Sequence, residues 1–410
     1  MSTIRRQPPT SAEIQNAEIA RLIEQAKWNR GAKRSLTGGG TPSSLPGEIG
    51  LQLTNRCNLR CVHCFQWGDN GQYKAYSREA QRAELDIGII EQLLVETRPV
   101  NARLYIWGGE PLVYRDFGKL LGLIKRERRW SVICTNGIGI ERHAEAIFDA
   151  SETLAMLFSL DGFKDQNDTL RAPGAFAKTL ESIRNLVDAK AAGRFKGEVS
   201  VAAVISEGLI GRINEFVQFI QDLGVNTLHL NFPWYISSES ARRMDELYNS
   251  SFGWLRDMKL HSQSGPPSWH AYTFRLPDTA IGLLQEELES LHARSWRVRL
   301  KVQPLLSRGE VAAFVQGSET PPLGHSRCVS IATRLSVLPN GGVTTCKLFP
   351  EFTIGNLHDA GLDAIWNGSV ATHAREILSR GLTPICSRCV QLYLNRAEPM
   401  FSEPLEHANG

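Results

Sequence analysis

Between residues 48 and 235, short runs of apolar residues alternate with longer stretches whose apolar residues recur at helical spacing. The short runs are rich in Leu, Ile, Val and Phe, which is typical of buried strands. The predicted strands are Glu48–Leu53, Arg103–Trp107, Ser131–Thr135, Leu154–Leu160, Glu198–Ile205 and Asn226–Phe232. The helices predicted between them are Asp86–Thr97, Phe117–Arg128, Arg142–Ala150, Ala175–Ala189 and Arg212–Leu223.

This alternation indicates an α/β fold. Strands that are apolar along most of their length, each followed by an amphipathic helix, form parallel sheets covered by helices. Six such units predict a partial (β/α)6 barrel and not a closed barrel of eight units. In these sheets the reactive groups gather where the strands end. We therefore expect the functional site at the carboxyl ends of the predicted strands.

The remaining pattern divides the chain into further regions. One amphipathic helix, Ser11–Asn29, precedes a linker rich in Gly, Pro and Ser. After residue 235 we expect the helices Ser240–Met258 and Ile281–Arg294, a further strand at Arg297–Val302 and a hairpin at Leu335–Cys346 with an Asn340-Gly341 turn. The expected domains are 1–47, N-terminal helix and linker; 48–235, barrel core; 236–327, helical connecting region; 328–395, small cysteine-rich domain; and 396–410, tail.

Composition narrows the functional class. The 410 residues are 42% hydrophobic and 22% charged, as in an ordinary globular enzyme, and the net charge of +3 gives no support for nucleic-acid binding. No run of 18 apolar residues is present, so we expect no transmembrane helix, and the N-terminus lacks a signal peptide's apolar segment. Eight cysteines without an export signal predict a cytoplasmic protein whose thiols bind metal.

Three cysteines crowd into one predicted loop. Cys57, Cys61 and Cys64 have the spacing C-x3-C-x2-C, directly after the first strand. Three thiolates can hold three irons of a 4Fe–4S cluster and leave the fourth iron open, whereas clusters that only store electrons have four protein ligands. Structural zinc takes four ligands, commonly as separated pairs, and His63 lies too close to Cys64 in sequence to complete such a site well. The spacing favours a cluster with an open iron.

Four more cysteines lie near the C-terminus. Cys328, Cys346, Cys386 and Cys389 could form a tetrahedral zinc site or hold one fully ligated 4Fe–4S cluster. Cys134 falls within the apolar third strand, where we expect a buried, inert thiol.

Four strand-end motifs together resemble the radical SAM superfamily over residues 48–235. They are the cysteine loop, Gly108-Gly109-Glu110-Pro111, Thr135-Asn136-Gly137 and Ser159-Leu160-Asp161-Gly162. The resemblance implies that the open iron binds S-adenosyl-L-methionine and that the reduced cluster cleaves it to a 5′-deoxyadenosyl radical, which removes hydrogen from a C–H bond. It also implies that the cofactor site contains His63 near adenine, Gly108, Gly109, Glu110 and Pro111 at the methionyl amino group, Asn136, and Ser159 and Arg171 at the ribose and carboxylate.

The C-terminal spacing resembles the SPASM/twitch extensions of radical SAM proteins. Cys328-x12-Gly341-x4-Cys346 matches their opening and Cys386-x2-Cys389 their continuation, but no cysteine follows Cys389. The resemblance therefore implies one auxiliary 4Fe–4S cluster with four ligands, suited to electron transfer; zinc stays the alternative.

These features predict net oxidation or cross-linking of a peptide or natural-product precursor, with a one-electron reductant such as flavodoxin or ferredoxin as a partner. The alternatives are a radical SAM dehydrogenase of a sugar or cyclitol alcohol and a non-enzymatic zinc-binding scaffold. The 47 residues before the core, with one helix, are fewer than a leader-peptide-binding domain usually has. Candidates for a general base are Tyr235, His229 and Glu239.

Overall fold

The computed structural model describes residues 44–260 and 265–394. One sheet runs through it in the order β10-β9-β8-β1-β2-β3-β4-β5-β6-β7. Strands β1 to β7 pair in chain order and in parallel. The strands are β1 Glu48–Gln52, β2 Arg103–Trp107, β3 Ser131–Thr135, β4 Leu154–Ser159, β5 Glu198–Val204, β6 Thr227–Asn231, β7 Arg299–Gln303, β8 Arg334–Val337, β9 Gly342–Thr344 and β10 Thr353–Asn356.

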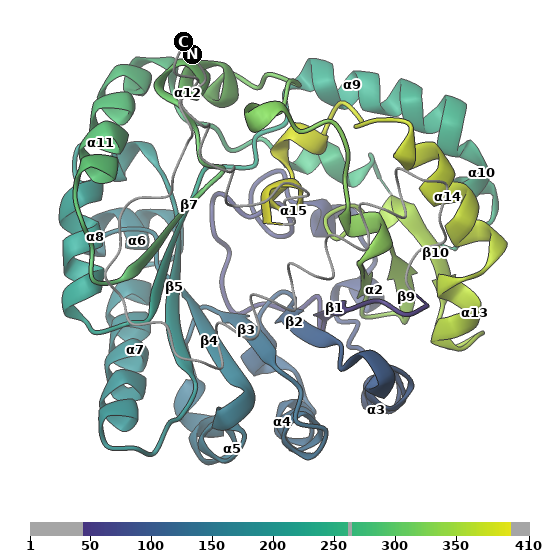
Figure 1. Cartoon of the computed structure of the whole chain (residues 1–410), viewed down its shortest axis with the longest axis horizontal. Coiled ribbons are helices and arrows are strands. Elements are labelled where there is room, and N and C mark those ends of the chain that lie inside the picture. Colours follow the sequence, from purple (N-terminus) through teal and green to yellow (C-terminus); the bar gives the residue numbers. More distant parts are fainter. Residues whose placement is uncertain (1–43, 261–264, 395–410) are drawn as a thin grey trace, which may run out of the picture.

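Helices cover the outer side of this curved sheet, as Figure 1 shows for α3, α4, α5, α7 and α8. They begin where the sequence supplies caps; for example, the Asp86 side chain accepts from the Gly88 amide at the start of α3. The α-helices are α2 Arg78–Gln81, α3 Ile87–Glu96, α4 Phe117–Arg126, α5 Ala144–Asp149, α6 Lys164–Leu170, α7 Ala175–Ala191, α8 Ile213–Asp222, α9 Ser238–Leu247, α10 Gly253–Asp257, α11 Ile281–Ala293, α12 Arg308–Val315, α13 Leu362–Trp366, α14 Ser369–Ser379 and α15 Val390–Leu394.

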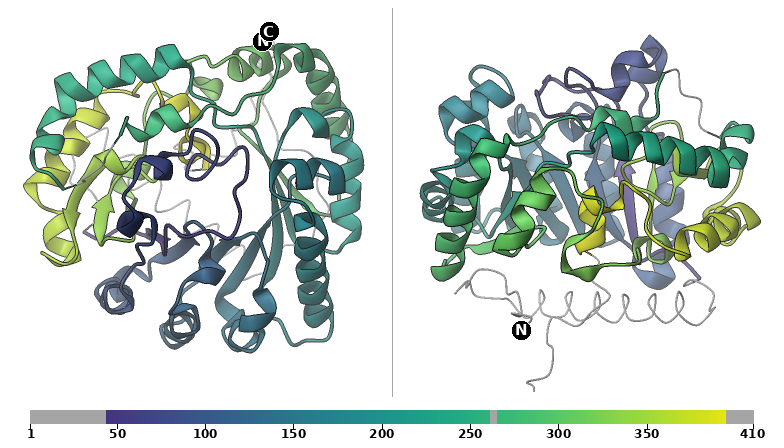
Figure 2. Two further views of the ribbon diagram at one scale, coloured as in Figure 1. Left: turned by 180° about the vertical axis from the view of Figure 1, so that it is seen from behind. Right: turned by 90° about the horizontal axis from the view of Figure 1, so that it is seen from above.

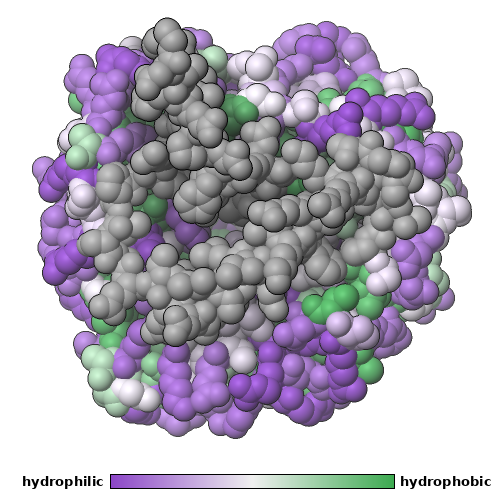
Figure 3. All heavy atoms as spheres, viewed as in Figure 1, coloured by the Kyte–Doolittle hydropathy of each residue, from purple (hydrophilic) through white to green (hydrophobic). Residues whose placement is uncertain are grey.

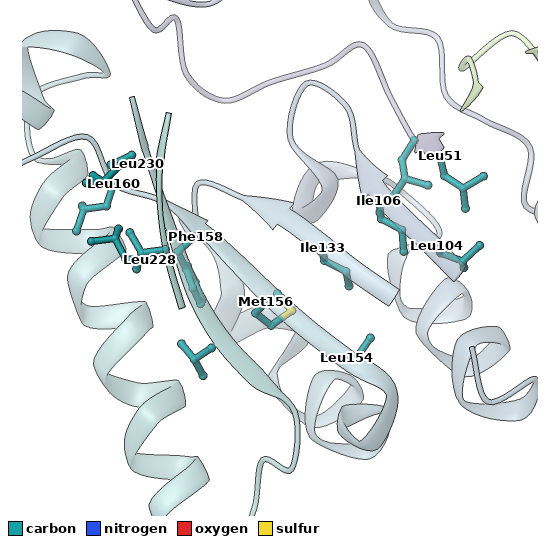
Figure 4. Close-up of a cluster of buried hydrophobic side chains, with 14 of the residues drawn as sticks. Leu51, Leu104, Ile106, Ile133, Leu154, Met156, Phe158, Leu160, Leu228 and Leu230 are labelled. Atoms are coloured by element: carbon teal, nitrogen blue, oxygen red, sulfur yellow. The ribbon is translucent and has the colours of Figure 1, made fainter. Parts of the chain in front are cut away.

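The main core lies between the sheet and the outer helices. Strand residues such as Leu104, Ile106, Ile133 and Phe158 are buried there against helix residues (Figure 4). The alternate strand positions face the concave side, so the sheet has one apolar and one mixed face. The surface outside the grey atoms in Figure 3 is mostly hydrophilic.

The six predicted core strands all form, and the further strand predicted at Arg297–Val302 forms as β7 and joins the parallel array. β7 lies in the region expected to be a helical connection and pairs with β6. The partial barrel therefore has seven parallel strands before the C-terminal region, one more than the (β/α)6 expectation. The predicted helix Ser11–Asn29 and the tail 396–410 lie outside the described residues.

The C-terminal hairpin extends the same sheet. β8 pairs in parallel with β1, and β9 and β10 follow antiparallel. Gly341 provides the positive φ of 80° that the predicted Asn340-Gly341 turn requires. In Figure 1, α15 is seen within the curve of the sheet. The pairing with β1 fixes the cysteine-rich region to the strand that leads into the first cysteine loop.

The burial of Cys134 differs from the sequence expectation. Its side chain is only partly buried, because β3 turns it to the concave face beside Tyr105 and Ser159. Alternation along the strand, not the local apolar composition, decides this placement.

Candidate functional site

The first cysteine loop leaves β1 at the carboxyl end of the sheet and crosses that end of the barrel, as the purple segment in Figure 2 (left) shows. It pairs by backbone hydrogen bonds with the loop after β2: Gly109 N donates to Thr54 O at 2.7 Å and Glu110 N to Arg56 O at 2.8 Å. A Cβ atom on Gly109 would lie 2.0 Å from Arg56 O. Glycine is therefore required here so that the two loops can meet.

The thiols of Cys57, Cys61 and Cys64 are partly buried, and none of them forms a disulfide. The amide of Leu59 donates to Cys57 Sγ at 3.4 Å, and the amide of Trp67 donates to Cys64 Sγ at 3.4 Å. Burial raises the pKa of Cys57 to about 12 and that of Cys61 to about 11. Because metal ligation requires thiolates, binding must replace these protons with cationic charge. Amide donors at the sulfurs fit thiolates bound to such a cation.

Glu110 joins three strand-end loops. Its carboxylate is 1% exposed and accepts from Thr135 Oγ1 at 2.6 Å, Asn136 N at 2.8 Å and Leu112 N at 3.0 Å. Burial raises the pKa of Glu110, and these hydrogen bonds act in the opposite direction. Asn136 Nδ2 donates in turn to Asn58 Oδ1 at 2.8 Å. The structure thus brings Glu110, Asn136 and the cysteine loop together.

A second set of predicted residues meets at Asp161. Arg171 Nε lies 2.7 Å and His63 Nε2 3.4 Å from Asp161 Oδ2. Burial alone would lower the pKa of Arg171, but Asp161 and then Cys61 hold it above its usual value. Arg171 Nη1 also approaches Cys61 Sγ at 4.0 Å. The arginine is therefore part of a buried network beside the cysteines and not a solvated surface charge.

This network leaves an atom for a ligand. His63 Nδ1 is buried without a hydrogen-bond partner in the part of the chain that the structure describes. Burial lowers the pKa of His63, which favours the neutral ring. An unpaired buried ring nitrogen suits a polar ligand such as an adenine. Ser159, by contrast, contacts Cys134, and no contact in the described residues joins it to His63 or Arg171.

Sequence reasoning did not include Asp161 among the site residues. Its backbone N–H and carboxylate are used within the protein: N donates to Asn167 Oδ1 and Oδ1 accepts from Val204 N. The available signal was the Ser-Leu-Asp-Gly run at the end of the fourth strand. Its contact with a residue ten positions later, Arg171, could not be read from the sequence.

The second group of cysteines lines one cavity. Cys328, Cys346, Cys386 and Cys389 line one cavity of about 50 Å³, together with apolar side chains such as Phe349 and Ile385 and polar ones such as Arg334 and Lys347. Burial raises the pKa of Cys386 to about 11 and that of Cys389 to about 12. Among the described residues, no three His, Cys, Asp or Glu side chains converge closely enough to hold one ion. The four thiols line one cavity, and four thiolates are the complete ligand set of a 4Fe–4S cluster.

Aromatic side chains connect the two groups. The ring of Phe65, which follows Cys64, stacks on Tyr272 with centroids 4.7 Å apart and an interplanar angle of 11°. Tyr272 contacts Phe349 at 5.5 Å, and its hydroxyl donates to Leu348 O at 3.1 Å. Phe349 lines the cavity that the four C-terminal cysteines share. Tyr272 comes from the region 236–327 that the sequence pattern resolved least.

The three candidates for a general base lie in different settings. Burial, and then Lys301, lowers the pKa of His229 to about 3, so its ring is neutral on β6. Tyr235 packs against Arg275 and Gly317. Glu239 lies in the first turn of α9 and forms an ion pair at 2.7 Å with Arg242, with both side chains more than half exposed. This surface ion pair argues against Glu239 as the base.

Family models match two parts of the chain. Residues 51–197 match the Radical SAM superfamily, and residues 328–390 match the SPASM iron–sulfur cluster-binding domain. S-adenosyl-L-methionine and iron–sulfur clusters are the cofactors of these two domains. No helix in residues 44–260 and 265–394 has the length and apolar character needed to cross a membrane.

Curated relatives include the mycofactocin maturase MftC of Mycobacterium ulcerans, 29% identical over 207 residues that cover 50% of this chain and 49% of that one. The subtilosin biosynthesis protein AlbA of Bacillus subtilis is 25% identical over 223 residues, covering 53% and 46%. The chain thus spans about half the length of the curated relatives it matches.

Solved structures share the fold. Streptococcus suis SuiB bound to S-adenosylmethionine has a TM-score of 0.56 at 15% identity, covering 88% of this chain and 74% of SuiB. SuiB bound to its precursor peptide SuiA has a TM-score of 0.55 at 15% identity, covering 89% and 74%.

Proposed function

Because residues 51–197 belong to the radical SAM superfamily and residues 328–390 to the SPASM iron–sulfur cluster-binding domain, we propose that this chain is a peptide maturase that oxidises or cross-links its substrate. The observation that carries the proposal is the arrangement of seven cysteines in two groups. Three lie on a strand-end loop, and four surround one cavity. The first set is incomplete for a 4Fe–4S cluster and the second is complete.

Cys57, Cys61 and Cys64 hold the first 4Fe–4S cluster in this proposal, and the loops around them hold S-adenosyl-L-methionine. When bound, these cofactors supply a 5′-deoxyadenosyl radical that removes a hydrogen atom from the substrate. Glu110 accepts from the methionyl ammonium, since a carboxylate has lone pairs beyond the three that its present donors use. Asp161 positions His63 and Arg171, because its fully buried carboxylate contacts both side chains.

Further contributions to cofactor binding come from the remaining predicted positions. Gly108, Gly109 and Pro111 shape the loop that carries Glu110, and Asn136 fixes that loop to the cysteine loop. Ser159 lies on the concave face of β4, where it would reach the ribose side of the ligand. These roles are part of the proposal.

Cys328, Cys346, Cys386 and Cys389 hold one auxiliary 4Fe–4S cluster in this proposal. Because four protein ligands leave no open iron, this auxiliary cluster would accept electrons and would not bind the substrate through iron. A substrate that has lost a hydrogen atom and then an electron is oxidised, which is why oxidation or cross-linking is the favoured outcome. The match of residues 328–390 to an iron–sulfur cluster-binding domain supports a cluster over a single zinc ion.

A peptide is the favoured substrate class. MftC is named a maturase, AlbA a biosynthesis protein of a bacteriocin, and one SuiB structure holds a precursor peptide. A one-electron reductant of the flavodoxin or ferredoxin type would reduce the cluster held by Cys57, Cys61 and Cys64. The loop that carries these cysteines reaches the surface, where Val62 is 50% exposed.

Iron and sulfide analysis of anaerobically prepared protein tests the cofactor assignment. We expect about eight irons per chain and formation of 5′-deoxyadenosine when dithionite and S-adenosyl-L-methionine are added. Stoichiometric zinc in both groups, or no 5′-deoxyadenosine from protein loaded with iron, would contradict the proposal.

Mass spectrometry tests the reaction. A short precursor peptide encoded beside this chain should lose two hydrogen atoms per modification in the complete reaction and none without S-adenosyl-L-methionine. A mass change on a sugar or cyclitol alcohol, with none on the peptide, would replace the maturase by a dehydrogenase.

A further inference from the structure

The first cysteine loop turns a row of side chains toward solvent. Exposure alternates along it: Arg56, Asn58, Arg60 and Val62 are exposed, and each residue between them is partly or fully buried. Two of these exposed side chains, Arg60 and Val62, flank Cys61, a proposed ligand of the first cluster. The exposed side of the loop therefore carries two cations and no carboxylate directly beside a proposed iron ligand.

The charge of Arg60 is held in a fixed place. Its Nη1 donates to Cys57 O at 2.9 Å and to Leu59 O at 2.8 Å, and its guanidinium lies 4.1 Å from the centre of the Trp67 ring. In the part of the chain that the structure describes, no carboxylate pairs with Arg60. The remaining N–H groups of the guanidinium can bind a carboxylate from outside the chain, and an ordered side chain loses little freedom when it does so.

The neighbouring ion pairs turn their cations outward. Arg56 and Arg115 both approach Glu84, at 3.3 and 3.9 Å, and their side chains are 51% and 78% exposed whereas that of Glu84 is 12% exposed. Lys119, 72% exposed, pairs in the same way with Asp116, which is 14% exposed. Solvent therefore meets the cations more than the carboxylates, so this side of the molecule has a positive potential.

The adjoining segment, residues 69–82, is nearly balanced in charge. Its exposed charged residues are the cations Lys74, Arg78 and Arg82 and the carboxylates Asp69 and Glu79. This segment does not cancel the positive charge around Arg60. A protein that binds here is therefore expected to be anionic.

An apolar contact lies within this charged surface. Among the large apolar side chains that the structure describes, Val62, Val95, Met258 and Leu283 are exposed, and Val62 is the most exposed at 50%. Its backbone is held, since Val62 N donates to Leu170 O at 2.8 Å. Electron-transfer complexes bury little surface, and interfaces in general combine an apolar centre with a polar rim. Val62 surrounded by arginines matches that arrangement.

We propose that this surface docks a flavodoxin, with Arg60 and Val62 at its centre and Arg56 and Arg115 at its rim. The proposal rests on the proposed function for the need of a one-electron donor, and it adds where that donor binds. Flavodoxins have acidic surfaces around the exposed, apolar edge of their flavin, whereas ferredoxins cover their cluster with a polypeptide loop. In the complex the reduced flavin is oxidised by one electron, and the 4Fe–4S cluster of the first cysteine loop takes up that electron.

Calorimetric titration of the iron-loaded full chain with a purified, oxidised flavodoxin tests the docking. The titration is done anaerobically at low and at high salt, about 50 and about 300 mM. We expect binding that weakens at least about tenfold at the higher salt, because screening removes the attraction between exposed charges. Absence of binding, or binding that salt does not weaken, would overturn the proposal.

Charge variants locate the surface. Arg60→Glu should weaken flavodoxin binding at least about tenfold, and Arg60→Lys should keep most of it, because the charge stays. Arg115→Glu, at the rim, should weaken binding about threefold. Arg297→Glu is its matched control, since Arg297 is 74% exposed, pairs with Asp222 and precedes β7 at the opposite end of the sheet. Equal losses in the last two variants would show that overall charge, and not this surface, attracts the flavodoxin.

The apolar contact has its own pair of variants. Val62→Asp should weaken flavodoxin binding about tenfold, because it removes the contact and adds a negative charge. Leu283→Asp changes a side chain of similar exposure, 48%, on α11 and should leave binding unchanged. Iron content is measured in every variant of the cysteine loop.

Formation of 5′-deoxyadenosine with two reductants separates docking from chemistry. The rate with reduced flavodoxin is divided by the rate with dithionite, a small reductant that needs no docking surface. We expect this ratio to fall about tenfold in Arg60→Glu and to stay constant in Arg297→Glu. A constant ratio in Arg60→Glu overturns the inference while the proposed function stands, whereas no product with either reductant would contradict the proposed function. A ferredoxin that binds more tightly than flavodoxin, with the same dependence on Arg60, would overturn the choice of partner.

Discussion

The thiols of Cys57, Cys61 and Cys64 come from one short loop, whereas those of the second group come from three segments that meet only in the fold. The first loop is fixed by backbone hydrogen bonds to the loop after β2. The second group of cysteines depends on β8, which joins the sheet beside β1, and on the C-S-R-C segment some 60 residues after Cys328.

The surroundings of the two groups differ as well. Polar and charged side chains border the first group: Asn58, Arg171 and, through it, Asp161. The second group is bordered by apolar side chains, including Phe349, Phe352 and Ile385, and by as many polar ones, among them Arg334 and Thr383. A polar border suits a site that receives a charged ligand, and the aromatic and aliphatic side chains at the second group help to keep water away from a buried group. One thiol group thus lies on the loop that leaves β1, and the other is built around β8, the strand that pairs with β1.

The largest expected effect separates the two groups by activity. Cys61→Ala should reduce 5′-deoxyadenosine formation to background and remove about four irons, because it takes away a ligand of the open set. Cys386→Ala should also remove about four irons but keep 5′-deoxyadenosine formation, since its thiol belongs to the other cavity. Iron analysis and chromatography measure both. Loss of 5′-deoxyadenosine formation in both variants would mean that the groups do not act separately.

The next effect separates the groups by stability. Loss of metal from the second group should lower the free energy of unfolding by on the order of 5 kcal/mol or more, because there metal binding and folding of three segments are coupled. Loss from the first group should cost much less, since its loop is already held to the sheet. Anaerobic denaturant unfolding of Cys386→Ala and Cys61→Ala measures this. Equal losses would contradict the contrast in assembly.

Asp161→Asn tests the polar border of the first group. It leaves Arg171 without its buried partner and should cost roughly 3–5 kcal/mol of stability. It should also weaken binding of S-adenosyl-L-methionine, because His63 and Arg171 lose their common contact. Asp149→Asn is the matched control: it breaks an exposed pair with Lys125 and should cost about 1 kcal/mol or less. Urea unfolding and calorimetric titration measure the two quantities, and similar losses in both variants would count against the network.

The smallest effect concerns the aromatic contact between the groups. Tyr272→Phe removes the hydrogen bond to Leu348 O and keeps the stacking on Phe65, so it should cost about 1 kcal/mol and leave the iron content unchanged. Tyr114→Phe, which removes a similar bond to Leu85 O, is the control. A loss of iron in Tyr272→Phe alone would give the hydroxyl a role in forming the second site.

Much of the fold was predictable because its signals are local. Apolar runs marked the six strands, and Asn340-Gly341 marked the turn of the hairpin. A further strand was predicted at Arg297–Val302, but its place at the edge of the parallel sheet was not, since Arg299–Gln303 lies between helices in a less regular region. Its membership depends on pairing with β6, a contact that sequence spacing does not reveal.

The sequence alone determined the ligand chemistry: thiol spacing, the glycines that let two loops meet, and the carboxylate of Glu110 at a strand end. Covalent proximity is enough to bring Cys57, Cys61 and Cys64 together. Only the tertiary structure decided that Asp161 pairs with Arg171, that Tyr272 lies between the two thiol groups, and that Arg56 and Arg115 share Glu84. These contacts join segments that are distant along the chain, and they arise from packing across the sheet, which no local pattern specifies.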